Sequence, residues 1–131
     1  MKNELIKRAF KAMENAYAPY SKFTVGASLL CKNGKIYDGC NVENASFGAT
    51  LCAERSAFAS AIAQGDREFE AVAIVCSNQD GKTRLCPPCG ICRQVMAELC
   101  DKDFKIFLSD GSETKQYTLS EILPLSFKLE V

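Results

Sequence analysis

Apolar residues near the start of the chain repeat at the spacing of an amphipathic helix. Leu5, Ala9 and Met13 lie on one face of such a helix, among charged neighbours. Asn3 is a suitable N-cap, because its side chain can accept a hydrogen bond from the first helical turn. Pro19 cannot continue a helix. The pattern therefore predicts a helix that begins at Asn3 and ends before Pro19.

The following segment changes to the two-residue alternation of a β-strand, over residues 25–31. Asn33-Gly34 then supplies a dipeptide that two-residue hairpin turns prefer. We expect residues 36–42 to return as a second, antiparallel strand.

Helical and strand patterns alternate in the rest of the chain. The run Ala71–Cys76 is apolar throughout and predicts a strand buried on both faces. Thr118 and Glu121 have the spacing of a capping box at the start of a short helix, which Pro124 would end. The other predicted elements are a helix over 53–62 stopped by Gly65, a loop over 77–88, a helix from Gly90, a strand over 104–108 and a turn at 110–111. This order predicts an α/β fold, with a mixed sheet between helices on its two faces.

The length and the charge of the chain argue against several classes of protein. The chain has 131 residues, the size of one domain. Lys plus Arg and Asp plus Glu both number 16, and this zero balance disfavours nucleic acid or an anionic membrane as a partner. No apolar run approaches the ~18 residues of a membrane span, and residues 1–10 lack the apolar core of a signal peptide. We therefore expect a cytoplasmic protein.

The chain contains no histidine and eight cysteines. A catalytic triad, a Cys-His dyad and a histidine base are therefore excluded within one chain. In a reducing compartment, clustered thiols more often bind metal or do redox work than form disulfides. Cys31, Cys40, Cys76 and Cys100 are interpreted as small buried apolar residues.

Two cysteine motifs each open a predicted helix: Cys52-Ala53-Glu54 and Pro88-Cys89-Gly90-Ile91-Cys92. Helix N-termini favour thiolates, and three thiolates suit Zn²⁺ while leaving a fourth position for water. Glu54 is placed to act on that water as a base. Arg55 and Arg93, each next to a cysteine, are candidates to offset the negative charge.

The cysteine pattern alone leaves other sites open. Cys86 could supply a fourth sulfur and make a closed, structural zinc site. Cys86 and Cys89 could instead form a redox pair, and the spacing Cys86-x-x-Cys89-x-x-Cys92 also resembles the start of an iron–sulfur motif. The function classes are accordingly an enzyme with catalytic zinc or a zinc-stabilised interaction module.

The motifs together resemble those of the small, homotetrameric cytidine deaminases. The resemblance covers nearly the whole chain and implies a three-layer α-β-α sandwich around a mixed five-stranded sheet, in a single domain over residues 1–131. The segments that carry it are Phe23-x-Val25-Gly26-Ala27, Asn41-Val42-Glu43-Asn44, Cys52-Ala53-Glu54-Arg55, Pro88-Cys89-Gly90-x-Cys92-Arg93-Gln94 and Leu123-Pro124-x-x-Phe127.

The resemblance implies hydrolytic deamination of cytidine and deoxycytidine to uridine and deoxyuridine, with release of ammonia, in pyrimidine salvage. Cys52, Cys89 and Cys92 would bind one Zn²⁺ per subunit, and the zinc-bound hydroxide would attack carbon 4 of the base. Glu54 would carry the proton to the ring. A deaminase of the same fold acting on a base in nucleic acid, or on a nucleoside-like drug, remains the alternative.

The resemblance also assigns roles around the substrate and between subunits. Asn41 and Glu43 would bind the ribose hydroxyls. Phe23 would pack against the nucleoside. The Ala53 backbone would contact the edge of the base, and Arg55 and Gln94 would tune the zinc thiolates. Phe127 would stack on a base bound in the neighbouring subunit, and Phe47 would also contribute across subunits.

Overall fold

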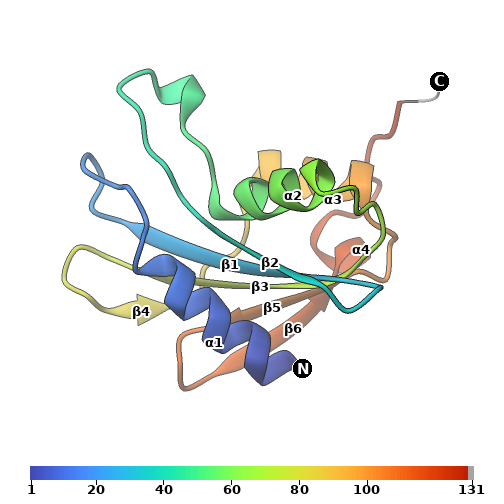
Figure 1. The fold of residues 1–131 in the computed structure, drawn as a ribbon, viewed down its shortest axis with the longest axis horizontal. Helices are drawn as coiled ribbons and strands as arrows, with labels where there is room; N and C mark the ends of the chain where they lie inside the picture. Colours follow the sequence, from blue (N-terminus) through green and yellow to red (C-terminus); the bar gives the residue numbers. More distant parts are fainter. Residues whose placement is uncertain (130–131) are drawn as a thin grey trace.

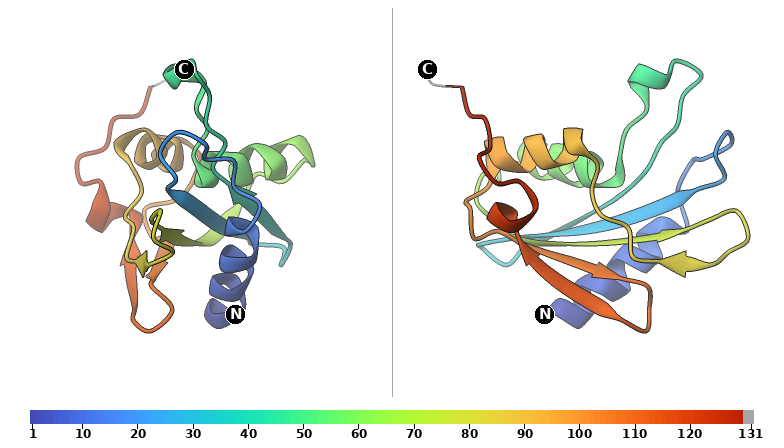
Figure 2. Two further views of the ribbon diagram at one scale, coloured as in Figure 1. Left: turned by 90° about the vertical axis from the view of Figure 1, so that its left-hand side faces the viewer. Right: turned by 180° about the vertical axis from the view of Figure 1, so that it is seen from behind.

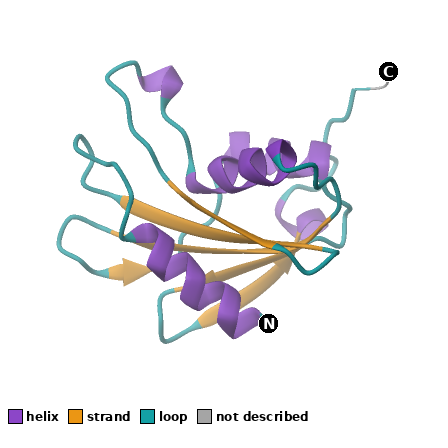
Figure 3. Cartoon of the chain, viewed as in Figure 1, coloured by secondary structure: helices purple, strands orange, loops and turns teal. Residues whose placement is uncertain are grey.

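The computed structural model describes residues 1–129 and shows a sheet with helices on both faces (Figures 1 and 3). No helix in that range is both long and apolar enough to cross a membrane. The helices are α1 Lys2–Met13, α2 Ala53–Ala63, α3 Gly90–Leu99 and α4 Leu119–Ile122, with a short 3-10 helix, η1, at Phe47–Ala49. The strands are β1 Thr24–Cys31, β2 Ile36–Cys40, β3 Phe69–Ser77, β4 Thr83–Arg84, β5 Lys105–Ser109 and β6 Thr114–Thr118.

The sheet is mixed and has the strand order β2-β1-β3-β5-β6, with β4 paired to the end of β3. The β3–β5 pair is parallel, whereas the other pairs of strands are antiparallel. The predicted α/β class and three layers are confirmed, but the sheet has six strands rather than five. Two strands are not predicted by the pattern: β6, which follows the predicted turn at 110–111, and β4, which lies in the predicted loop over 77–88. β4 is two residues long and polar, so it carries no periodic signal.

Both faces of the sheet are covered. Helix α1 packs Leu5 and Ala9 against alternate residues of β3, among them Ala73. Helices α2 and α3 cover the opposite face, where Phe58 and Met96 belong to the larger core cluster. Figures 1 and 2 show α1 on one side of the sheet and these two helices on the other. Because β3 is covered on both faces, its side chains are apolar almost throughout, as predicted.

Two glycines allow the helices to approach the sheet closely. A Cβ atom on Gly39 of β2 would lie 2.7 Å from the backbone nitrogen of Ala57 in α2, and closer still to the Ala53 carbonyl oxygen. A Cβ atom on Gly26 of β1 would collide in the same way with the backbone of α1 on the other face. Gly39 thus sets the depth at which α2 rests on one face of the sheet, and Gly26 sets that of α1 on the other.

The start of the chain differs from the prediction. Helix α1 begins at Lys2, with Met1 as its N-cap, so Asn3 lies inside the helix and caps nothing. The helix ends at Met13, because the chain beyond it pairs with the segment that follows β2. The Tyr17 N–H donates to the Asn41 carbonyl at 3.0 Å, and this pairing overrides the helical pattern.

The predicted hairpin and helix cap are confirmed, but the hairpin turn is longer than expected. The Cys31 N–H donates to the Lys35 carbonyl at 2.9 Å, so the turn holds three residues, 32–34, with Gly34 at φ +93°. Strand β2 ends at Cys40 rather than at residue 42. Thr118 and Glu121 form the expected capping box at the start of α4, with the Thr118 N–H donating to the Glu121 carboxylate at 2.7 Å.

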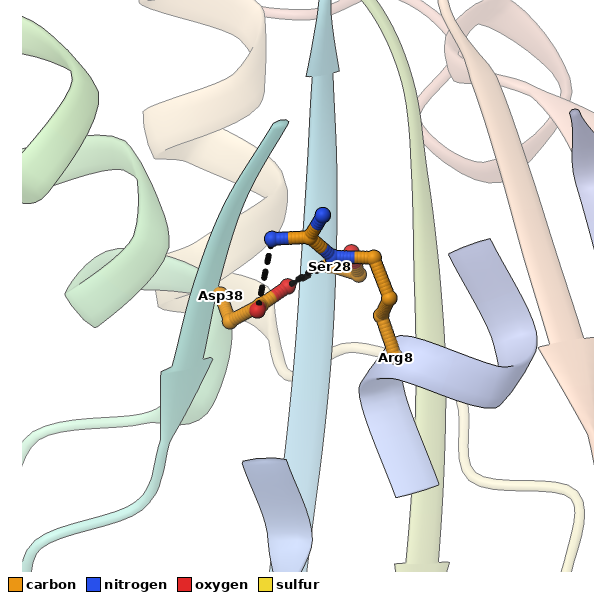
Figure 4. Close-up of polar contacts among 3 residues, drawn as sticks. All are labelled: Arg8, Ser28 and Asp38. Carbon is orange, nitrogen blue, oxygen red and sulfur yellow. Dashed lines mark hydrogen bonds and ion pairs between the residues drawn. The ribbon is translucent and has the colours of Figure 1, made fainter. Parts of the chain in front are cut away.

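A polar cluster fastens α1 to the β1–β2 hairpin (Figure 4). Arg8 donates to both carboxylate oxygens of Asp38, at 3.2 and 3.0 Å. The fully buried Ser28 hydroxyl donates to Asp38 at 2.8 Å. Asp38 is therefore the acceptor for a surface cation and a buried hydroxyl.

We expect Asp38→Ala to lower the free energy of unfolding by about 1–2 kcal/mol, because it leaves the buried Ser28 hydroxyl without its acceptor. Arg8→Met should cost less than about 1 kcal/mol, since the ion pair is partly exposed. Urea denaturation of the two variants measures the difference. Equal losses would contradict the assignment of the larger effect to Ser28.

Candidate metal centre and active-site cleft

Three cysteines meet where two helices begin. Cys52 is the N-cap residue of α2 and Cys89 is the N-cap residue of α3. Cys92 lies one turn inside α3 and is buried. The sulfur atoms of the three residues all lie within 4.8 Å of one another, and those of Cys52 and Cys89 are 3.9 Å apart.

These sulfurs have the spacing that a tetrahedral zinc ion needs. With Zn–S bonds of about 2.3 Å, tetrahedral geometry separates two sulfurs by about 3.8 Å. Within residues 1–129, the group of metal-ligating side chains consists of Cys52, Cys89 and Cys92, and Cys86 does not belong to it. The arrangement therefore favours a three-sulfur site with an open position over a closed four-sulfur site.

The charge of Arg55 faces this cluster. Its Nη2 atom donates to the Cys52 sulfur at 3.4 Å and to the Thr50 carbonyl at 3.2 Å. Hydrogen bonds from the Cys92 thiol and from Arg55 lower the pKa of Cys52 to about 5, against the opposing effect of burial. Cys52 is thus prepared to bind a cation as a thiolate.

Arg93 and Gln94 have other partners. Arg93 donates to the carbonyls of Pro88 and Ile122, at 2.8 and 2.7 Å, and so ties the segment before α3 to α4. The Gln94 amide donates to the Phe127 carbonyl at 3.0 Å. The structure therefore gives both side chains positions that hold chain segments, whereas sequence reasoning placed them on the thiolates.

Glu54 lies beside the sulfurs with only 4% of its surface exposed. Burial raises the pKa of Glu54 to about 7, and the charge of Cys52 acts in the same direction. A carboxyl group with this pKa can both accept and donate a proton near neutral pH. The positive charge of a bound ion would act in the opposite direction.

A cleft of about 300 Å³ opens in front of this cluster. Cys86 and Pro87, from the segment before α3, form part of its wall. The predicted site residues that line it are Phe23, Asn41, Cys52, Ala53, Glu54 and Cys89. Residues from β1, the β2–α2 connection and the start of α3 thus meet in one cavity with the metal-ligating atoms.

Asn41 organises the part of the cleft wall that Phe23 and Val25 form. The residue is almost fully buried, and its side-chain oxygen accepts a hydrogen bond from the Val25 N–H at 2.9 Å. Its amide nitrogen donates to the Phe23 carbonyl at 2.8 Å. One amide proton is left over for another acceptor.

Glu43 and Phe47 line a neighbouring hollow of about 330 Å³, which shares Thr50 with the cleft. Glu43 accepts hydrogen bonds from the Tyr20 and Ser21 backbones, at 3.0 and 3.1 Å, and from the Ser21 hydroxyl. The Ser21 bonds lower the pKa of Glu43. Glu43 therefore fixes the loop that precedes β1 and does not line the cleft itself.

Phe47 and Phe127 are separated from the cleft and exposed, with 80% and 67% of their surfaces open to solvent. The connection that carries η1 projects away from the sheet on the side of α2 and α3 (Figure 2). Within residues 1–129, both rings are open to solvent rather than packed in the core.

Sequence reasoning missed one residue next to the site. The guanidinium of Arg84, in β4, lies 5.0 Å from the centre of the Phe23 ring. No motif marks Arg84, and its position depends on the pairing of β4 with β3.

Comparisons with known proteins agree with this site. Residues 1–108 match the family described as cytidine and deoxycytidylate deaminase zinc-binding region. A cytidine deaminase of Halalkalibacterium halodurans is 49% identical over 127 residues, which are 96% of this chain and 93% of that protein. A cytidine deaminase of Sporosarcina psychrophila is 43% identical over 128 residues, which are 97% of this chain and 91% of that protein.

A solved structure shows the same fold. The crystal structure of cytidine deaminase from Burkholderia pseudomallei has a TM-score of 0.89 and 43% identity, and the match covers 97% of this chain and 99% of that chain. The chain is therefore a member of the cytidine and deoxycytidylate deaminase family, and its three clustered cysteines lie within the residues that match the zinc-binding region.

Proposed function

We propose that this protein, as one domain over residues 1–131, hydrolyses cytidine and deoxycytidine to uridine and deoxyuridine and releases ammonia. The observation that carries the proposal is the buried Glu54 beside three clustered sulfurs, on the wall of a cleft of about 300 Å³. The similarity to curated cytidine deaminases supports cytidine as substrate.

The residues of the site divide the chemistry between them. Cys52, Cys89 and Cys92 would hold Zn²⁺, and the ion would supply a water molecule of lowered pKa next to carbon 4 of the pyrimidine. Glu54 takes one proton of the water and transfers it to ring nitrogen 3. It then takes the proton of the hydroxyl formed on carbon 4 and gives it to the amine, which leaves as ammonia while carbon 4 becomes a carbonyl. Protonation of the ring nitrogen compensates for the conjugation lost when the ring is attacked. Arg55 offsets the negative charge of the thiolates through Cys52.

The cleft wall accounts for recognition of the nucleoside. Phe23 packs against it, the Ala53 backbone contacts the base edge, and the remaining amide proton of Asn41 is available to a ribose hydroxyl. Glu43 completes the ribose site from the adjoining hollow.

We further propose a homotetramer that works in cytoplasmic pyrimidine salvage. The exposed rings of Phe47 and Phe127 support this assembly, because each would remove apolar surface from water in a contact between subunits. In the tetramer, Phe127 stacks on a base in the neighbouring subunit, and Phe47 also contributes across the subunit boundary.

Steady-state assays test the substrate. Zinc-loaded protein should convert cytidine to uridine, followed by the loss of ultraviolet absorbance, and an oligonucleotide that contains cytosine should neither react nor compete. Absence of turnover with cytidine and deoxycytidine would overturn the proposed function. Turnover of the oligonucleotide would instead place the protein among the deaminases of nucleic acid.

The metal site gives a separate prediction. We expect Cys89→Ala to lose bound zinc, because only two sulfurs remain, and Cys86→Ala to keep about one zinc per chain, because Cys86 stands outside the cluster. Metal content after dialysis measures this, and cobalt spectra report the number of sulfur ligands. Zinc loss in Cys86→Ala, with a four-sulfur spectrum in the parent protein, would favour a structural site.

A further inference from the structure

Phe23 lines the cleft, and hydrogen bonds hold its backbone on both sides. The Phe23 N–H donates to the Ser21 hydroxyl at 3.0 Å, and its carbonyl accepts the Asn41 amide at 2.8 Å. These bonds hold the main chain. They leave the rotation of the half-buried ring to whatever touches its faces.

Arg84 touches one of those faces. Its guanidinium carbon lies 5.0 Å from the ring centroid, within the ~6 Å range of a cation–π contact. Arg84 makes no ion pair with any of residues 1–129, so a carboxylate does not compete with the ring for its charge.

The strand register explains how Arg84 reaches Phe23. Val25 of β1 pairs with Cys76 of β3, and Cys76 pairs with Arg84 of β4. Residues directly opposite in antiparallel pairs point to the same face of a sheet. Val25 packs on the core under α2 and α3, so Arg84 points to the face that carries the metal site. Phe23, two residues before Val25, is on that face as well.

The backbone of β4 is held in place. The Cys76 thiol donates to the Arg84 carbonyl at 3.4 Å, and the Thr83 hydroxyl donates to the Asp110 carbonyl at 2.6 Å. Because the backbone of β4 is fixed, the stacked Arg84 side chain can restrict rotation of the Phe23 ring. A side chain on a loose loop would instead move together with the ring.

We propose that Arg84 is a positioning residue for the substrate, which stacks on Phe23 and holds the ring in the orientation that packs against the nucleoside. This inference rests on the proposed function. Its expected signature is weaker binding with unchanged chemistry, because among the described residues Arg84 is not one of the groups that act on Cys52 or Glu54. Removing an exposed cation–π contact corresponds to a change of about two- to fivefold in an equilibrium constant.

The experiment compares Arg84→Met with Lys82→Met in zinc-loaded protein. Arg84→Met should raise KM for cytidine about threefold and leave kcat within twofold. Arg84→Lys should recover part of the difference, because the cation is kept but the planar stacking is lost. Lys82→Met removes an exposed cation from the same connection and should change neither constant.

A double-mutant cycle isolates the contact. In a Phe23→Leu background, the additional effect of Arg84→Met on KM should disappear. Nuclear magnetic resonance gives a readout without turnover: the Arg84 Nε–H signal should be shifted by the ring current of Phe23 and should move in Phe23→Leu.

The outcomes separate the two proposals. If wild-type protein fails to deaminate nucleosides, the proposed function falls and this inference falls with it. If wild-type protein is active, three results would each overturn the role of Arg84 alone. KM for cytidine could be unchanged in Arg84→Met, or it could rise equally in Lys82→Met. Arg84→Met could also raise KM as much in the Phe23→Leu background as in the wild-type background.

Discussion

Glu54→Gln is expected to lower kcat for cytidine at least about a hundredfold, the lower end of what a general acid–base residue contributes. Glutamine keeps the size and hydrogen-bonding shape of the side chain but cannot carry a proton from water to the ring. The residue is almost fully buried, so bulk water is not positioned to replace it.

Three measurements make this result specific: kcat, zinc content and thermal stability of the variant. Zinc should stay bound, since Glu54 is not among the clustered sulfur ligands, and the fold should be at least as stable, since a buried ionisable group has been removed. Substantial turnover in zinc-loaded Glu54→Gln would exclude Glu54 as the proton carrier.

Gly39→Ala is expected to lower the free energy of unfolding by at least about 2 kcal/mol and to weaken zinc binding. The new methyl group would occupy the space of the α2 backbone, and that backbone cannot yield as a flexible side chain does. Displacement of α2 shifts Cys52, its N-cap residue, relative to Cys89. Denaturation curves and zinc affinity measure the two effects.

Gly26→Ala is the control for this prediction. It introduces a comparable collision with α1, on the face of the sheet opposite the metal site. We expect a similar loss of stability but near-normal zinc affinity in the part of the population that stays folded. Equal losses of zinc affinity in both variants would show that general destabilisation, and not the position of α2, accounts for the result.

The two cysteine motifs could be located from the sequence because each is local, whereas the choice of Cys52, and not Cys86, as the third ligand followed from the family resemblance. Cys89 and Cys92 are close along the chain, and a helix start favours a thiolate at each predicted position. The buried strand β3 was predictable for a similar reason, since its apolar run has one explanation in a sheet covered on both faces.

Other features depend on contacts between distant segments, which no local pattern encodes. The end of α1 is determined by the pairing of Tyr17 with Asn41, and the approach of Arg84 to Phe23 by the pairing of β4. The bond of Gln94 to Phe127 likewise joins a helix to a segment whose path the sequence does not reveal. The motif located Gln94 near the metal helix but could not identify its hydrogen-bond partner.

The meeting of Cys52 with Cys89 and Cys92 has a thermodynamic consequence. An ion held there acts as a removable cross-link between α2 and α3, whose starts lie far apart along the chain. Since a ligand that binds the folded state alone stabilises it, each tenfold rise in free zinc above the dissociation constant adds about 1.4 kcal/mol. The resistance of the fold to heat and proteolysis should therefore increase with the concentration of free zinc.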